Sequence, residues 1–146
     1  MFNFINGGVT APIGFTASGI HCGIRKNRSK RDLSLIYSEN QANAAAVYTT
    51  NLVKGAPILV DMENLADGKA QAIIVNSGNA NTCNADGVEK AMQMCKIAAR
   101  QCAVLPSNVI VASTGVIGMP LDVTPIEKSI GQLYWDLEHS VAGSRN

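Results

Sequence analysis

The protein has 146 residues, of which 47% are hydrophobic and 16% charged, and its net charge is +1. A chain of this length and apolar content can bury on the order of 68–70% of its unfolded surface in one core, which argues against disorder. No run approaches the ~20 consecutive apolar residues of a membrane span, and the N-terminus lacks a signal-peptide pattern. These features exclude a membrane protein and predict a cytoplasmic one.

Five of the twelve Lys and Arg residues lie between positions 25 and 31. The rest of the chain holds seven basic and eleven acidic residues, a net charge of −4. Nucleic-acid-binding proteins more often spread positive charge over a whole face, and aromatic residues for base stacking are scarce at 5%. Nucleic acid is therefore not an expected partner. A solvated turn is the favoured interpretation of the basic run, because Asn27 and Ser29 interrupt it, and a polyanion-binding patch is the alternative.

The four cysteines, Cys22, Cys83, Cys95 and Cys102, form no C-x-x-C motif and have no zinc-site spacing with the two histidines. No metal or other cofactor is expected. Cys95 and Cys102 are seven positions apart, which predicts two small buried side chains on one helix face. Structural thiols are favoured over redox or catalytic thiols, because no resolving partner or base stands near them in the sequence.

The first half of the chain predicts mainly strands. The glycine-rich run 7–24 favours strand segments with sharp bends, and the alternation in 32–38 predicts a strand. The β-branched and aromatic residues of 44–50 favour another strand, although its alanine triplet could begin a helix. A short helix is expected to start at Pro57 and to end at Asp67-Gly68. Its buried stripe would be Ile58, Leu59, Met62 and Leu65.

The second half alternates strands and helices. The uninterrupted apolar runs 72–75 and 109–112 predict strands covered on both faces. Between them, 86–103 shows a strong helical stripe with Asp86 as cap, and Pro106 is expected to stop this helix. A capping box at 124–127 predicts a last helix, whose apolar face comprises Ile126, Ile130, Leu133 and Leu137. The order of elements predicts the α/β class, layered as sheet and helices.

Two predicted strands run into polar, glycine-containing segments, 76–82 and 113–118, where α/β proteins place sites. Asn76, Asn79, Asn81 and Asn84 favour a turn held by asparagine side chains. Thr114 offers a hydroxyl and Gly115 an N–H, and two such donors could stabilise a developing oxyanion. Hydroxyls such as Ser77 and Ser113 have no evident His and Asp partners, so a structural role is favoured over nucleophilic catalysis.

Five motifs occur in order along the chain: 7–15 (GGVTAPIGF), 19–24 (GIHCGI), 47–51 (VYTTN), 75–81 (VNSGNAN) and 112–118 (ASTGVIG). Together they closely resemble the ornithine acetyltransferase family of arginine biosynthesis, the bifunctional glutamate N-acetyltransferases. The resemblance is collinear from about residue 7 to residue 130. It implies the layered sheet-and-helix sandwich of the DmpA/ArgJ-like type, of which residues 1–146 would form the amino-terminal portion as a single incomplete domain.

Members of this family cleave themselves before an internal threonine, whose freed amine and hydroxyl act as base and nucleophile. The resemblance implies that acetyl passes from N-acetylornithine to this threonine and then to glutamate, and acetyl-CoA is a donor for some members. The family's oxyanion hole lies in the S-T-G-V-I-G motif and carries over to Thr114 and Gly115. These are the two expected catalytic residues of this chain.

The family's Ala-Thr-Met-Leu cleavage motif does not occur in this sequence, nor do the Thr-Thr-Asp segment and lysine of its substrate pocket. We therefore expect an amino-terminal segment that is inactive alone. Its expected partner is a carboxy-terminal β chain that carries the nucleophilic threonine, in an αβ hetero-oligomer. An apolar face should be exposed, on the amino-terminal strands or the last helix.

Two other functions compete with the enzyme subunit. One is a non-catalytic module whose two Gly/Asn loops bind a small anion, and the other is a degenerate structural paralogue kept for assembly. A threonine-bearing half encoded directly downstream would exclude the paralogue.

Overall fold

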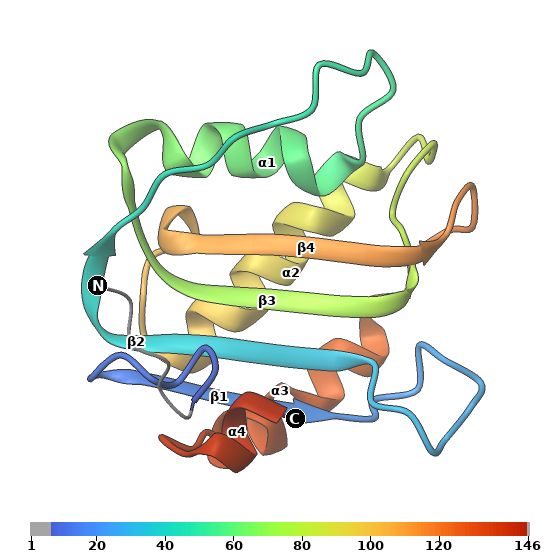
Figure 1. Ribbon diagram of the computed structural model, residues 1–146. Helices are drawn as coiled ribbons and strands as arrows, with labels where there is room; N and C mark the ends of the chain where they lie inside the picture. Colours follow the sequence, from blue (N-terminus) through green and yellow to red (C-terminus); the bar gives the residue numbers. More distant parts are fainter. Residues whose placement is uncertain (1–6, 146) are drawn as a thin grey trace.

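The computed structural model describes residues 7–145, which form a mixed sheet with helices packed against it (Figure 1). The described strands follow the order β1-β2-β3-β4 across the sheet: β1 (Phe15–Ile20), β2 (Leu33–Asn43), β3 (Lys69–Asn79) and β4 (Val109–Val116). The pairs β1–β2 and β2–β3 are antiparallel, whereas β3 and β4 are parallel. The α/β prediction is confirmed.

Four α-helices and two short 3-10 helices connect and cover the described strands. They are α1 (Ala56–Asn64), η1 (Leu65–Asp67), α2 (Gly87–Cys102), η2 (Pro106–Asn108), α3 (Thr124–Trp135) and α4 (Val141–Arg145). Helix α2 is the crossover between the parallel strands and lies behind the sheet in Figure 1, whereas α4 lies at the β1 edge. Because β3 leads into α2 and α2 returns to β4, the carboxyl ends of both strands meet at one end of the sheet.

The hydrophobic core fills the space between one sheet face and the helices. Leu35, Ile74 and Val111 are aligned across β2, β3 and β4, and all three are at most 1% exposed. Helix side chains such as Met94 and Leu133 are fully buried in the same core. The two-layer arrangement explains why these three strands present apolar residues at alternate positions.

The other sheet face is less covered, which corrects the prediction for 72–75 and 109–112. Ile36, Ile73 and Ile110 form the neighbouring row across the same strands, and each is only half-buried. They line part of a shallow hollow of about 320 Å³. The two strands are therefore covered on one face and not on both, because α2 and α3 pack on the same side.

The prediction of a strand or helix over 44–50 is wrong. This segment has no regular structure, and Val47 is 99% exposed. Its first residue donates its N–H to Gly68 O, and from there the chain leaves the sheet. The β-branched residues of this segment favour a strand. However, Asn43, the last residue of β2, pairs with Lys69, the first residue of β3, so no β3 residue remains to pair with the segment beyond it.

Helix α1 starts and ends close to the predicted positions, with Pro57 in its first turn. The predicted buried stripe is wrong, since Leu59 and Met62 are 42% and 48% exposed. Val60 and Asn64 are buried instead, because α1 turns this face toward α2 and β4.

Helix α2 confirms the predicted stripe in the main, with Cys95 and Cys102 both buried. Asp86 occupies the N-cap position but makes no capping hydrogen bond through its side chain. The helix ends at Cys102, where Ala103 adopts a left-handed conformation (φ 56°). Pro106 therefore starts the short helix η2 and does not itself stop α2.

Helix α3 occupies the predicted region, but the capping box does not form. Val123 is the N-cap, and Asp122 Oδ1 accepts the N–H of Thr124 at 2.9 Å. Ile126, Ile130 and Leu133 are all buried. The apolar face of the last helix is therefore not the exposed surface expected from the sequence.

Candidate functional site at the ends of the parallel strands

The segments expected to be loops after Val75 and Ala112 are continuations of β3 and β4. Ser77 is the register partner of Thr114, and Gly78 is the register partner of Gly115. The register shifts at Gly78–Asn79, immediately before β3 ends. The two sequence-predicted catalytic residues thus lie side by side at the carboxyl end of β4, on paired strands and not on a free loop.

Gly115 is required by the close approach of the two strands. Its φ is +138°, and a Cβ built on it would lie 2.3 Å from the carbonyl carbon of Gly78 and 2.5 Å from the nitrogen of Asn79. Thr114 and Gly115 are both exposed, and no residue in the described range 7–145 hydrogen-bonds the Thr114 hydroxyl. This hydroxyl is therefore available to a ligand.

The asparagines at and after the end of β3 build the scaffold under this site. The predicted asparagine-held turn starts only at Asn79, the last residue of β3, whereas Asn76 lies within the strand. Asn79 Oδ1 accepts the N–H of Asn81 at 2.8 Å, and Asn79 Nδ2 donates to the carbonyl oxygens of Met119 and Pro120 at 2.9 and 3.1 Å. Asn84 Nδ2 also donates to Met119 O at 2.9 Å. These bonds fasten the chain after β4 to the chain after β3, so the end of β4 is held in place.

The serine hydroxyls of the two segments, on Ser77 and Ser113, differ in their hydrogen bonding. Ser113 Oγ is buried and, among residues 7–145, has no hydrogen-bond partner; the same is true of Oδ1 of its register partner Asn76. Ser77 Oγ accepts hydrogen bonds from Arg25. No histidine hydrogen-bonds either serine within the described part of the chain. The preference for structural serines is consistent with this geometry.

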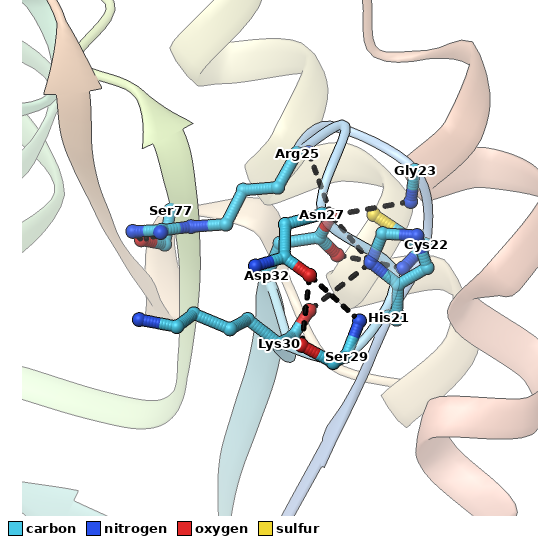
Figure 2. Close-up of polar contacts among 9 residues, drawn as sticks. All are labelled: His21, Cys22, Gly23, Arg25, Asn27, Ser29, Lys30, Asp32 and Ser77. Carbon is cyan, nitrogen blue, oxygen red and sulfur yellow. Dashed lines mark hydrogen bonds and ion pairs between the residues drawn. The ribbon is translucent and has the colours of Figure 1, made fainter.

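A second polar cluster lies in the loop between β1 and β2 (Figure 2). The fully buried carboxylate of Asp32 accepts three backbone N–H groups, from Cys22 at 2.6 Å, Gly23 at 3.2 Å and Arg25 at 2.8 Å. Burial by itself would raise the pKa of Asp32, but these hydrogen bonds, chiefly from Arg25 and Cys22, outweigh it and lower the pKa below its usual value. Asp32 therefore stays ionised and fixes the loop.

Sequence reasoning missed a histidine–carboxylate pair in this cluster. His21 Nδ1 lies 3.1 Å from Asp32 Oδ2 and 3.1 Å from Lys30 O. No serine or threonine hydroxyl in residues 7–145 hydrogen-bonds the His21 ring, so within these residues the pair has no nucleophile as a third member. Burial raises the pKa of the neighbouring Cys22 thiol to about 12, which disfavours its thiolate form.

Arg25 connects the two clusters, as Figure 2 shows. Its Nε donates to Ser77 Oγ at 3.1 Å, and its Nη2 contacts the same oxygen. The two ion pairs found within residues 7–145, His21–Asp32 and Arg100–Glu127, leave the Arg25 guanidinium without a carboxylate. The solvated-turn interpretation fits the exposed Lys26 and Arg28, but Arg25 turns inward over the end of β3.

The donors gathered here suit a negative charge and not a cation. No group of three or more His, Cys, Asp or Glu residues that could hold a metal ion occurs in the part of the chain that the structure describes. Over the same residues, no helix has the length and apolar character to span a bilayer. The fold and site thus define an α/β protein with an exposed hydroxyl and a guanidinium at the ends of two parallel strands.

Solved structures of other proteins share this fold. The arginine biosynthesis bifunctional protein ArgJ of Bacillus halodurans superposes with a TM-score of 0.88 at 40% identity, over 95% of this chain and 72% of that one. The ornithine acetyltransferase of Mycobacterium tuberculosis, in complex with ornithine, gives a TM-score of 0.90 at 31% identity, over 97% and 77%. The sequence pattern of the ArgJ family matches residues 16–144, and the chain belongs to this family.

Curated relatives agree with this assignment. The chain is 50% identical over 127 residues to the bifunctional ArgJ protein of Caldanaerobacter subterraneus subsp. tengcongensis, and 52% identical over 129 residues to that of Gloeobacter violaceus. These matches cover 86% and 87% of this chain and 31% of each relative. The chain thus corresponds to about a third of the length of these relatives, and the resemblance inferred from the five motifs is confirmed.

Proposed function

We propose that this chain is the amino-terminal segment of an arginine-biosynthesis acetyltransferase, one that moves acetyl from N-acetyl-L-ornithine to L-glutamate. Membership of the ArgJ family supports the reaction class, and a relative of the same fold has been solved with ornithine. Acetyl-CoA is the second proposed acetyl donor. The acetyl group would be carried between donor and acceptor on a threonine of the remaining protein.

Thr114 and Gly115 are the proposed oxyanion hole of this segment. The observation that carries the proposal is their placement: an unengaged, exposed hydroxyl stands next to a glycine that is locked against the β3 backbone. During attack on the acetyl group, the carbonyl oxygen gains negative charge, and two fixed donors lower the energy of that state. The asparagine scaffold fastens the chain after β4 to the end of β3, which limits movement of the backbone that carries both residues.

The nucleophile is proposed to come from a carboxy-terminal β chain, in an αβ hetero-oligomer. Burial raises the pKa of the Cys22 and Cys95 thiols to about 12, so neither is a thiolate at neutral pH. Val116 and Ile117, directly after the proposed oxyanion residues, are 55% and 64% exposed. A partner that brings the threonine to this strand end would also cover these apolar side chains.

The experiment is an acetyl-transfer assay from N-acetylornithine to glutamate, with the 146-residue chain alone and with the complete protein that contains it. We expect background for the chain alone and turnover for the complete protein, with an acetylated threonine detectable by mass spectrometry after the donor is added. Clear turnover by the chain alone would overturn the division of roles. An inactive but folded complete protein would overturn the proposed reaction.

A further inference from the structure

A basic cleft opens beside the proposed acyl site. It has a volume of about 570 Å³ and is lined by His21, Cys22, Gly23, Arg25, Lys26 and Arg28. None of these lining residues is acidic, and the nearby Asp32 carboxylate is fully buried, where it accepts three backbone N–H groups. The cleft therefore presents cationic and donor groups to solvent without a carboxylate among them.

The cleft is positively charged, whereas the rest of the chain carries a net negative charge. Arg25, Lys26 and Arg28 take part in none of the ion pairs found within residues 7–145. Outside the basic run 25–31, the chain carries a net charge of −4. Three cations that form no ion pair within the described residues surround one concave surface, and the single buried Asp32 carboxylate offsets only part of their charge. Their combined positive potential attracts an anion more strongly than scattered surface charges do.

The cleft is also rigid where it meets the strand end. Asp32 fixes the backbone of Cys22, Gly23 and Arg25, and Asn27 Oδ1 accepts both the N–H and the hydroxyl of Ser29, at 3.0 and 2.8 Å. A cleft whose backbone is fixed before binding loses little conformational entropy when the ligand arrives.

Arg25 places the cleft next to the site. Its guanidinium contacts Ser77 Oγ, and Ser77 is the register partner of Thr114. Its Cγ lies only 2.8 Å from the position of a Cβ on Gly78, the register partner of Gly115. A ligand held by Arg25 would therefore have its other end within reach of the proposed oxyanion hole.

We propose that this cleft binds the phosphate groups of a phosphorylated acyl donor and that Arg25 is the innermost phosphate-binding residue. A single carboxylate, such as that of an amino-acid substrate, carries one charge and would leave most of these cations uncompensated. A phosphate or pyrophosphate group carries more charge and offers several oxygens to a guanidinium fork. The identity of the ligand as an acyl donor rests on the proposed function, whereas the binding of phosphate does not.

Isothermal titration calorimetry on the 146-residue chain at low ionic strength tests this proposal. The probes are adenosine 3′,5′-bisphosphate, inorganic pyrophosphate and, as the carboxylate, acetate. We expect both phosphate probes to bind and Arg25→Gln to weaken them by about tenfold, the size of one lost charge-assisted contact. Arg100→Gln is the matched control, because it removes the same charge from an exposed ion pair with Glu127 on other elements. It should change the affinity less than about twofold.

Three results would overturn the proposal: no binding of either phosphate probe, equal weakening by Arg25→Gln and Arg100→Gln, or acetate binding as tight as that of pyrophosphate. Circular dichroism checks that Arg25→Gln is folded. The double variant Lys26→Gln/Arg28→Gln changes two exposed side chains and is expected to weaken both phosphate probes as well. Since binding is measured without acetyl transfer, an inactive complete protein would refute the proposed function and leave this site standing.

Discussion

Gly115 on β4 and Gly78 on β3 are register partners, and a Cβ on Gly115 would lie 2.3 Å from the Gly78 carbonyl carbon. Both glycines have positive φ, +138° and +108°. The two strand ends can approach only because Gly115 has no side chain, whereas a Cβ on Gly78 would meet Arg25 Cγ at 2.8 Å and not β4. Thr114, the residue before Gly115, therefore has its position set by a backbone contact with a strand 37 positions earlier in the chain.

We predict that Gly115→Ala lowers the free energy of unfolding by about 1–3 kcal/mol, because the strands must separate and a strained φ must be adopted. Denaturant unfolding followed by circular dichroism measures this change. Gly131→Ala is the control, since a Cβ on this α3 glycine would meet no heavy atom within 4 Å. Alanine favours the helix there, and the free energy of unfolding should rise by up to about 1 kcal/mol. Equal effects of the two substitutions would contradict the close-approach argument.

We predict that Thr114→Ala in the complete protein lowers kcat by ~10²–10³-fold, with a smaller change in KM, because an oxyanion donor acts mainly in the transition state. Thermal unfolding should not change, since the side chain is exposed and, within residues 7–145, makes no hydrogen bond. Thr114→Ser keeps the hydroxyl and should retain much more activity. A Thr114→Ala enzyme with wild-type kcat would remove this hydroxyl from the mechanism.

Asp61 predicts a pH dependence of stability. Burial raises its pKa from 3.8 to about 6, and the hydrogen bond from the Val111 N–H, 2.9 Å from Oδ1, offsets only part of this effect. The folded chain therefore binds more protons than the unfolded chain between about pH 4 and pH 6. The stability contributed by the protonated carboxyl is complete below pH 3.8 and is lost as the pH rises through about 6.

We expect Asp61→Asn to be more stable than the native chain at pH 7, by on the order of 2 kcal/mol. The asparagine oxygen can still accept the Val111 N–H, but no charge is buried. Urea unfolding at pH 4, 5, 6 and 7 should show the difference growing with pH. Glu63→Gln, an exposed change on the same helix, is the control and should show no such trend. A difference that is constant across this range would show that Asp61 is not the group responsible.

Local sequence patterns predicted best the helices and strands whose buried side chains recur regularly along one face. The helical stripe of 86–103 gave α2 nearly to the residue, because its buried side chains recur at helical spacing along one face. The apolar run 72–75 predicted a strand correctly and its burial incorrectly. An uninterrupted apolar run cannot distinguish a strand covered on both faces from one that is covered on a single face, since the covering helices are set by the fold.

For the candidate site, the family motif is the basis for proposing Thr114 and Gly115. The surroundings of these two residues could not be predicted, because they depend on residues far away in sequence. Arg25 contacts Ser77 across 52 positions, and His21 meets Asp32 across a turn whose shape the basic run did not reveal. Hydrogen bonds of this kind leave no periodic signal. They become visible only when the register of the sheet brings the segments together.

The last prediction concerns the exposed apolar side chains near the site. Ile117 and Val116 follow Gly115, and their segment is fastened to the chain after β3 by the hydrogen bond from the Gly118 N–H to Thr82 O, at 2.9 Å. These side chains thus form a fixed apolar surface in water. A fixed surface of this kind favours association, because burial recovers hydrophobic free energy without ordering a flexible loop.

We therefore predict that the 146-residue chain self-associates and that the double variant Val116→Ser/Ile117→Ser reduces this association. Sedimentation velocity over a concentration series should show a rising weight-average coefficient for the native chain and a nearly constant one for the variant. Ile13→Ser is the matched control, since Ile13 is 96% exposed but precedes β1 in the chain. If the native chain is strictly monomeric, or if Ile13→Ser has the same effect as the double variant, the segment after Gly115 is not the interaction surface.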